Sequence, residues 1–398
     1  MRFHLFDSSP CGFPSPRVPL LPILGRHSLG KPNFVDGLLL GEGRKCSYFA
    51  RGRYALHAAY SLSGVGVSGG ILAPSYHCRT MLDPAIRLGA EIRLYTLEKN
   101  LAPNLSRIRE IIRGGTIPIK AILATHYFGL PQNFVELSDL CGEFGVSLIE
   151  DCSHAIVTGC RSDLLGQYGQ YVVSSPYKFF PCADGGILIT SDANVKEKGE
   201  KASVLAETKE ILKSAHKLLV CPTIADKKLE SLDFEIDALT RTVFTPANQS
   251  QEELVTPSRH YVHENENASG LGWSRWLAKH TNLSRLVTRR RDNFNQWLRA
   301  VDGLPHCRPL FNALPDGVVP YMFPLYIDNP DTHFYLLKHL GIPIWRWDEL
   351  AVSDCKFATD YRLKLLHLPC HQELSFQEML WMTSAVSKAM QIDSLPAL

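Results

Sequence analysis

The stretch AILATHYFGLPQNFVELSDLCGEFGVSLIED (residues 121–151) decides the fold. Its apolar runs at residues 121–124 and 146–149 have the length of buried strands. Residues 134–144, between the two runs, have the length and the apolar spacing of a helix. Two strands that are joined through a helix pair in parallel, so this stretch predicts one unit of a parallel sheet.

The same alternation continues on both sides of this stretch. It predicts helices at residues 54–62, 81–88 and 104–113, and strands at residues 70–73, 92–95 and 185–190. The sequence therefore predicts an α/β fold, in which helices cover both faces of a mainly parallel sheet. Because ligands bind beyond the carboxyl ends of parallel strands, polar residues that follow a strand are candidates for a site, as at Ser75-Tyr76-His77, Thr125-His126 and Glu150-Asp151.

Composition divides the chain into three parts. Residues 1–45 are rich in Pro and Gly and are predicted to form an N-terminal arm, followed by a large domain at 46–250 and a smaller α+β domain at 251–398. Residues 192–260 are rich in Lys and Glu and are predicted to form surface helices. The smaller domain contains all six tryptophans and three clear signals, namely a helix over 283–301, a strand over 322–327 and a capping box at Ser375 and Glu378.

Composition also excludes several classes of protein. The 398 residues are 45% hydrophobic and carry a net charge of +2, too small for a protein that coats nucleic acid or an anionic membrane. No run of about 18 apolar residues could span a bilayer, and Pro19 and Pro22 interrupt the apolar residues near the N-terminus, so no signal peptide is predicted. We therefore expect a cytoplasmic protein whose eleven cysteines are thiols.

Three motifs could carry chemistry, and each has a purely structural alternative. Arg51-Gly52-Arg53 precedes a helix whose first N–H groups favour a phosphate, but it could equally be a simple loop-to-helix transition. Asp151 and His154 follow a buried strand, where carboxylates also serve as structural caps. Lys178 lies among aromatic and apolar residues, where burial would favour a neutral amine that can form a Schiff base; the alternative is a surface lysine with a buried stem.

Two further patterns are rejected. The segment Gly64-Val-Gly-Val-Ser-Gly69 has the letters of a dinucleotide-binding fingerprint, but it follows a helix and precedes a strand, the reverse of what that motif needs. His367, Cys370 and His371 lie close together in sequence, but no second group of ligands with zinc spacing accompanies them. No metal site is therefore predicted.

Taken together, the segments resemble the DegT/DnrJ/EryC1/StrS family of aminotransferases, which use pyridoxal 5'-phosphate (PLP). The matching segments share their order and spacing with the family and lie between about residue 45 and the C-terminus. They are residues 50–56, 73–78, 88–90, 125–129, 149–155, Lys178 with 184–186, and 366–373. The resemblance implies a fold-type I transferase, with a seven-stranded, mainly parallel sheet and a smaller C-terminal domain, that forms a homodimer.

The resemblance also implies roles for particular residues. Lys178 falls where the family's Schiff-base lysine lies, Asp151 where an aspartate pairs with the pyridine nitrogen, and His154 beside the phenolic oxygen of the cofactor. The other implied cofactor contacts are Gly52 and Arg53 at the phosphate, Ser175 as a hydroxyl for the same group, Tyr76 or His77 as the ring that stacks on the cofactor, and Ser269 in a segment that approaches the neighbouring subunit's site.

The chain departs from the family near the lysine and at the phosphate. Val173 occupies the position five residues before Lys178, where the family has a serine, so that Ser174 and Ser175 are shifted inward. Arg53 replaces a small hydroxyl residue. These departures bear on the choice of substrate more than on the binding of the cofactor.

The function implied by the resemblance is the transfer of an amino group, from glutamate, to a keto group of a nucleotide-linked sugar or a related metabolite. A PLP-dependent sugar dehydratase is one alternative, although the family's dehydratases have histidine in place of Lys178. The other alternative is a non-enzymatic sensory or scaffold protein of a polysaccharide or antibiotic gene cluster, which the altered loop before Lys178 motivates.

Overall fold

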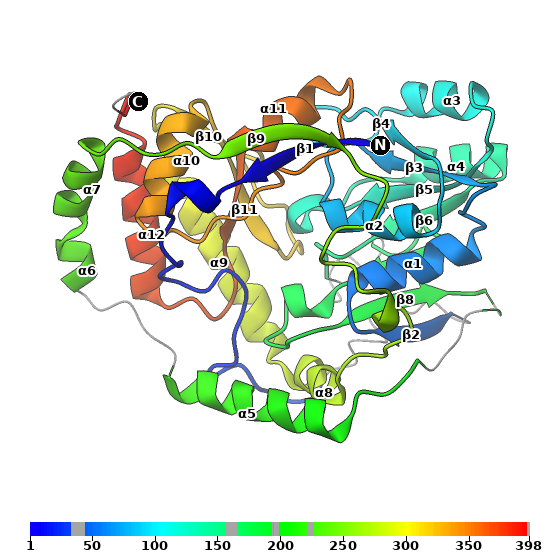
Figure 1. The fold of residues 1–398 in the computed structure, drawn as a ribbon. Coiled ribbons are helices and arrows are strands. Elements are labelled where there is room, and N and C mark those ends of the chain that lie inside the picture. Colours follow the sequence, from blue (N-terminus) through cyan, green and yellow to red (C-terminus); the bar gives the residue numbers. More distant parts are fainter. Residues whose placement is uncertain (33–43, 157–164, 193, 195–198, 221–226, 396–398) are drawn as a thin grey trace.

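The computed structural model describes residues 1–32, 44–156, 165–192, 194, 199–220 and 227–395. It contains a seven-stranded sheet built from the first half of the chain and a three-stranded sheet built from the second half (Figure 1). None of the helices in these ranges combines the length and the apolar character that are needed to cross a membrane.

The large sheet confirms the predicted α/β fold. Its strand order is β2-β8-β7-β6-β5-β3-β4. The strands are β2 (Lys45–Phe49), β3 (Gly70–Pro74), β4 (Ile92–Tyr95), β5 (Ile119–Thr125), β6 (Ser147–Asp151), β7 (Tyr171–Ser174) and β8 (Gly186–Thr190). Strands β3 to β7 are parallel to one another, and β8 is antiparallel to both of its neighbours. The carboxyl ends of β3, β5, β6 and β7 therefore share one edge of the sheet.

Helices cover both faces of this sheet. Helices α1 (Gly52–Leu62) and α2 (Arg79–Arg87) pack on one face, and α3 (Leu105–Arg113) and α4 (Val135–Phe144) pack on the other. The start of α3 follows the sequence, because the side chain of Asn104 accepts a hydrogen bond from Arg107 N at 2.9 Å. The second face also contacts residues of the C-terminal half, so the two halves of the chain share one hydrophobic core there.

The C-terminal half forms an antiparallel sheet packed against helices. The sheet contains β10 (Cys307–Pro309), β11 (Met322–Ile327) and β12 (Leu365–Pro369). The helices are α8 (Gly272–His280), α9 (Leu283–Val301), α10 (Pro330–His339), α11 (Lys356–Lys364) and α12 (Phe376–Ala389). The predicted helix over 283–301, the strand over 322–327 and the capping box at Ser375 are all present.

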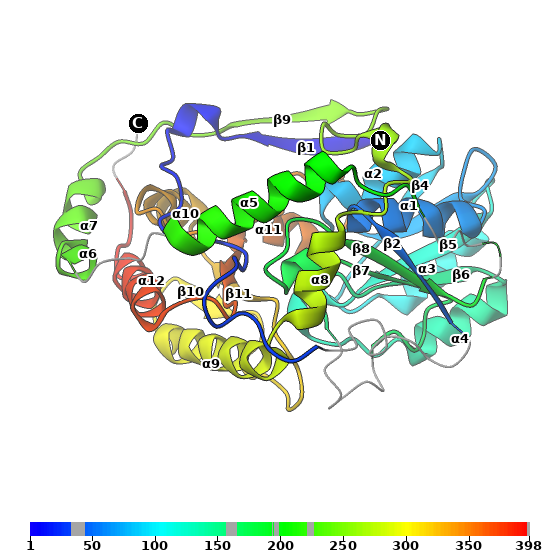
Figure 2. The same ribbon diagram turned by 90° about the horizontal axis from the view of Figure 1, so that it is seen from below.

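Six strands of the described part of the chain, including β2, β7, β10 and β12, were not predicted individually from the sequence, and two of the six form a separate two-stranded sheet. β1 (Arg2–Asp7) pairs antiparallel with β9 (Asn248–Glu253), and Figure 1 shows the two side by side across the top of the molecule. β9 lies in the segment predicted to be helical, which does contain α5 (Val204–Val220), α6 (Lys227–Glu230) and α7 (Leu232–Thr240). Figure 2 shows α5 beside α8. Every residue of β9 is exposed, so no apolar run marks the strand in the sequence.

Candidate active site

A cavity of about 400 Å³ lies where the edge of the large sheet meets the C-terminal half. Six residues predicted from the sequence line it, namely Gly52, Arg53, Asp151, His154, Ser175 and Lys178. Its opposite wall comes from the C-terminal half and consists of Tyr321, Trp345, Arg346, Trp347, Asp348, Glu349 and His367. The fold therefore brings together residues that are more than 300 positions apart in the chain.

One end of the cavity is a small polar cradle. Gly52 is the first residue of α1, and Ser175 Oγ donates to Ser153 Oγ at 3.1 Å directly beside it. A Cβ on Gly52 would lie 2.2 Å from Ser175 Oγ and 3.6 Å from Ser153 Oγ. Only a glycine leaves the helix N-terminus and the two hydroxyls open to a common ligand, an arrangement that suits a phosphate. Sequence reasoning did not single out Ser153, which lies between Asp151 and His154.

Asp151 ends strand β6 and is almost fully buried. Its Oδ1 accepts a hydrogen bond from Ser153 N at 2.9 Å. Thr125 pairs with it in the sheet, and Thr125 Oγ1 is enclosed without a partner among the described residues. A buried carboxylate in this position favours a cationic or protonated group of a ligand, as a protonated pyridine nitrogen would provide.

His154 is a neutral hydrogen-bond donor. Burial, together with the nearby charge of Lys178, lowers the pKa of His154 well below its usual value, so its ring is uncharged. Its Nδ1 accepts a hydrogen bond from Phe128 N at 3.4 Å, which places the ring proton on Nε2. The ring packs against Tyr321 at 4.5 Å and Trp347 at 5.4 Å between centroids. His154 can therefore donate one hydrogen bond from Nε2, but it cannot act as a charged acid near neutral pH.

Lys178 is presented by a loop that a buried arginine holds in place. It ends the short 3₁₀ helix Pro176–Lys178, and its Nζ lies 5.5 Å from the centre of the Tyr321 ring. Arg290 of α9 donates from Nη2 to Lys178 O at 3.1 Å and from Nε to Gln372 Oε1 at 2.8 Å. Gln372 Nε2 in turn donates to Phe179 O at 2.8 Å. This support was not predicted, because Arg290 lies among three consecutive arginines on a helix that was predicted only as amphipathic.

Three residues predicted to bind the cofactor lie elsewhere. Tyr76 and His77 do not line the cavity: both are fully buried, Tyr76 Oη lies 2.9 Å from His367 Nε2, and His77 Nε2 accepts from Ala351 N at 3.1 Å. Each ring is thus used in contacts with the C-terminal half. Ser269 donates to Glu200 O at 2.9 Å and lines a separate cavity of about 340 Å³ beside α8.

His367, Cys370 and His371, the three residues of the rejected zinc pattern, have different surroundings in the structure. His367 lines the main cavity, whereas Cys370 Sγ contacts Tyr321 O at 3.4 Å and His371 Nε2 lies 2.9 Å from Pro19 O. Sequence reasoning therefore missed His367 as a residue of the site. The only indication in the sequence was its place in the segment 366–373.

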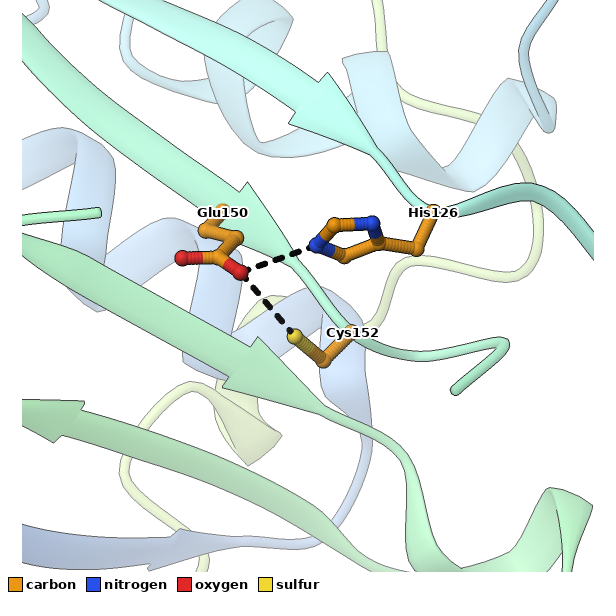
Figure 3. Close-up of side chains that lie close together, drawn as sticks. All are labelled: His126, Glu150 and Cys152. Atoms are coloured by element: carbon orange, nitrogen blue, oxygen red, sulfur yellow. Dashed lines mark hydrogen bonds and ion pairs between the residues drawn. The ribbon is translucent and has the colours of Figure 1, made fainter. Parts of the chain in front are cut away.

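A second group with the composition of a metal site consists of His126, Glu150 and Cys152 (Figure 3). Glu150 Oε1 accepts from His126 Nε2 at 2.8 Å and from Gly166 N at 2.6 Å. Its Oε2 accepts from the main-chain N–H groups of Tyr168 and Gly169 at 3.0 and 2.9 Å. His126 Nδ1 accepts from Gln132 N at 2.9 Å, so the proton of a neutral ring is on Nε2 and is donated to Glu150. The atoms that would bind a metal are thus already hydrogen bonded, and the group is a structural network.

Comparison with known proteins supports the resemblance to the DegT/DnrJ/EryC1/StrS family. The profile of the DegT/DnrJ/EryC1/StrS aminotransferase family matches residues 42–216, which include Gly52, Asp151, His154 and Lys178. The fold is similar to that of the aminotransferase TlmJ from Streptoalloteichus hindustanus, with a TM-score of 0.62, 18% identity, and coverage of 94% of this chain and 98% of that one. It is also similar to S. venezuelae DesV, with a TM-score of 0.61, 18% identity, and coverage of 96% and 100%. For Helicobacter pylori PseC, an aminotransferase involved in the biosynthesis of pseudoaminic acid, the values are 0.60, 16%, 95% and 99%. The predicted fold class is therefore confirmed, and residues 42–216 of the chain match the DegT/DnrJ/EryC1/StrS aminotransferase family.

Proposed function

We propose that the protein is a PLP-dependent aminotransferase that transfers an amino group, from glutamate, to a keto group of a nucleotide-linked sugar or a related metabolite. The observation that carries the proposal is the convergence, in one cavity, of the cradle at Gly52, the buried carboxylate of Asp151 and the amine of Lys178. Each of these groups matches a different part of PLP. When bound, PLP supplies a carbonyl carbon for exchange between amines and a ring that accepts electrons from the carbon beside the nitrogen.

The residues of the cavity would hold the cofactor at three places. The first N–H groups of α1 and the hydroxyls of Ser153 and Ser175 would bind its phosphate. Asp151 would hold a proton on the pyridine nitrogen, and Nε2 of His154 would donate to the phenolic oxygen. Because all these groups are fixed by strands, helix starts or buried contacts, they would orient the ring before a substrate arrives.

Lys178 would move the proton on which amino transfer depends. Its Nζ is the only amine that lines the cavity among the described residues, and it comes from the same end of the sheet as Asp151. As a free amine, it would take a proton from the substrate carbon that carries the nitrogen and deliver it to the former carbonyl carbon of the cofactor, on the other side of that nitrogen. The support that Arg290 gives to the Lys178 carbonyl would limit the movement of this loop during the transfer.

The rim of the cavity favours an anionic substrate. Arg51 packs its guanidinium 4.8 Å from the centre of the Tyr177 ring, and no carboxylate pairs with it among the described residues. Arg79 and Arg346 lie on the same rim and are paired with Glu349 and Asp348 at 3.0 and 3.3 Å. Arg53, which also lines the cavity, donates to His260 O and likewise forms no ion pair with a described carboxylate. Arg51 and Arg53 are therefore the cations best placed to bind a phosphate of a nucleotide or the carboxylate of an amino donor.

The experiment is a spectroscopic titration of the purified protein. Added PLP should give a visible absorbance band, borohydride should fix the pyridoxyl group on Lys178 in a peptide digest, and L-glutamate should convert the bound cofactor to its amino form. Lys178→Ala should lose all three results, whereas the matched control Lys201→Ala, on the exposed surface, should keep them. If Lys178→Ala kept the visible absorbance band as Lys201→Ala does, the assignment of Lys178 would be refuted. PLP binding without any conversion by amino acids would favour the non-enzymatic alternative.

The keto substrate and the oligomer require separate measurements. A panel of nucleotide-linked keto sugars, incubated with glutamate and analysed by mass spectrometry, should yield one amino sugar with the expected mass change. Formation of a deoxygenated sugar without amino transfer would favour the dehydratase alternative. Sedimentation should give the mass of a dimer, in keeping with the proposal that Ser269 approaches the site of a neighbouring subunit.

A further inference from the structure

A second imidazole, that of His367, belongs to the candidate site but has no part in the function proposed above. Strand β12 fixes its position, because His367 N donates to Trp345 O at 2.8 Å and His367 O accepts from Trp345 N at 3.0 Å. Its ring lines the same cavity as Lys178 and His154. The ring of Trp347 lies 5.4 Å from the centre of each of the two imidazoles and so packs beside both His154 and His367.

His367 and Tyr76 form a pair of neutral groups. Burial, together with the charges of Lys178 and Arg346, lowers the pKa of His367 to about 3. Burial also raises the pKa of Tyr76 well above its usual value, so the phenol keeps its proton. The 2.9 Å contact between Tyr76 Oη and His367 Nε2 thus joins a neutral phenol to a neutral imidazole, and one of them must donate.

The direction of this hydrogen bond follows from the surroundings of Tyr76. The phenol is fully buried, and His367 is the one hydrogen-bond partner of its Oη among the described residues. If Nε2 carried the proton, the hydroxyl hydrogen of Tyr76 would be buried without an acceptor, which is costly. Tyr76 therefore donates to Nε2, and the ring proton of His367 is on Nδ1.

His367 lines the cavity with about 1% of its surface exposed, and the position of its Nδ1–H group follows from its hydrogen bonds. In the described part of the chain the Nδ1–H group has no hydrogen-bond partner, and it is not among the polar atoms that are enclosed without one. A neutral donor on the wall beside Lys178 suits an uncharged oxygen, since a carboxylate or phosphate is better bound by the arginines of the rim. Sugars offer such hydroxyl and carbonyl oxygens.

We propose that His367 is a specificity-determining residue, whose Nδ1–H, oriented by the positioning residue Tyr76, donates a hydrogen bond to a hydroxyl or carbonyl oxygen of the keto substrate. The proposal rests on the proposed function for the identity of the substrate class. It assigns no proton transfer to His367. It also gives Tyr76 a role at the site, although its ring does not face the cavity.

The first test does not depend on activity. In protein labelled with ¹⁵N-histidine, long-range nitrogen–proton spectra report which ring nitrogen carries the proton, and the signal lost in His367→Asn identifies His367. The wild-type spectrum should show the Nδ1–H form, and Tyr76→Phe should shift the ring toward the Nε2–H form. A wild-type spectrum with the proton on Nε2 would overturn the proposal, whether or not the protein is an aminotransferase.

The second test separates the two substrates. His367→Leu should raise KM for the nucleotide-linked keto sugar that the wild-type enzyme aminates by about tenfold or more, and it should leave the conversion of bound PLP by L-glutamate within about twofold. His367→Asn, whose side-chain N–H can take the place of Nδ1–H, should restore most of the affinity. His371→Asn replaces another buried, neutral histidine outside the cavity and should leave both measurements unchanged. If His367→Leu impaired the reaction with the keto sugar and the reaction with L-glutamate equally, His367 would have only a structural role. The same conclusion would follow if His367→Asn did not restore the affinity for the keto sugar.

Discussion

Arg290, on helix α9 of the C-terminal half, donates a hydrogen bond from Nη2 to the main-chain carbonyl of Lys178 at 3.1 Å. The same guanidinium donates from Nη1 to the carbonyls of Pro320 and Tyr321, each at 3.1 Å. Arg290 is fully buried, and burial lowers its pKa to about 10, so it remains charged at neutral pH. The buried Arg290 thus fixes the loop that presents Lys178. It also fixes Tyr321, whose ring lies beneath the amine of Lys178.

Arg290→Lys should therefore weaken both the fold and the cofactor site. Lysine has a single nitrogen with three donors and cannot reproduce the planar set of contacts, so that buried carbonyls lose their partners. We expect the free energy of unfolding to fall by about 2–4 kcal/mol and the PLP absorbance to be lost at lower temperature than in the wild type. The exposed Arg299→Lys, on the same helix, is the matched control. Equal urea midpoints for the two variants would contradict this role of Arg290.

Gly52→Ala should impair the binding of PLP with little effect on the fold. The added Cβ would lie 2.2 Å from Ser175 Oγ, which can rotate away, but the cradle would then lose a hydroxyl and the space for a phosphate. We expect the dissociation constant for PLP to rise by about tenfold or more, equivalent to about 1.4 kcal/mol. Gly142→Ala is the control, because this glycine lies within α4 with nothing near its Cβ position, and the change should stabilise the fold by about 0.5–1 kcal/mol. Unchanged PLP affinity in Gly52→Ala would refute the cradle.

The sequence was most informative where the signal is local. The N-cap of Asn104, the length of α9 and the capping box at Ser375 depend on residues within one or two helical turns, and all three are present as predicted. Strand ends were also informative, because a parallel sheet collects them at one edge. Asp151, Ser175 and Lys178 consequently line one cavity.

Several of the features that were not predicted from the sequence depend on contacts between the two halves of the chain. Strand β1 forms because His4 N bonds to Leu350 O at 2.8 Å and because β9 pairs along its other edge, neither of which a local pattern reveals. Tyr76 follows β3, as the strand-end rule expects, but its hydroxyl and ring find partners in the C-terminal half and turn away from the cavity. His367 and Arg290 enter the site from that half for the same reason.

The network of His126 and Glu150 should stabilise the fold without a metal. Burial alone would raise the pKa of Glu150, but the hydrogen bonds from His126 and from the main chain outweigh it and lower the pKa. Glu150→Gln should reduce the free energy of unfolding by about 3–5 kcal/mol, because the amide nitrogen cannot accept hydrogen bonds and leaves buried N–H donors without an acceptor. Glu143→Gln, which removes a surface pair with Arg109, should cost about 1 kcal/mol or less.

Removal of metal provides a separate check on the same network. Treatment with a strong chelator such as 1,10-phenanthroline should leave both the unfolding midpoint and the PLP absorbance unchanged, because the candidate ligand atoms of His126 and Glu150 already bond to one another and to the main chain. A fall in the midpoint upon chelation, restored by added zinc, would show that the group shown in Figure 3 holds a metal after all.

Buried neutral histidines should make the protein sensitive to mild acid. Burial lowers the pKa of His77 to about 4 and is the main reason why the pKa values of His367 and His371 fall to about 3. In the unfolded chain each ring would take up a proton below about pH 6.5, whereas in the folded protein it would not. The unfolded state therefore binds more protons, and stability is lost as the pH falls below about 6.5, by about 1.4 kcal/mol per pH unit for each such histidine.

His77→Gln isolates one of these contributions. Glutamine Oε1 can replace Nε2 as the acceptor for Ala351 N, so the hydrogen bond to the C-terminal half is kept while the titrating group is removed. Urea unfolding between pH 6.5 and 4.5 should therefore show an average slope smaller than that of the wild type by about 1 kcal/mol per pH unit. The exposed His216→Gln should leave the slope as it is, because solvent surrounds that ring in both states. If His77→Gln and His216→Gln gave the same slope as the wild type, His77 would already be protonated in the folded protein, and its burial could not be a source of acid sensitivity.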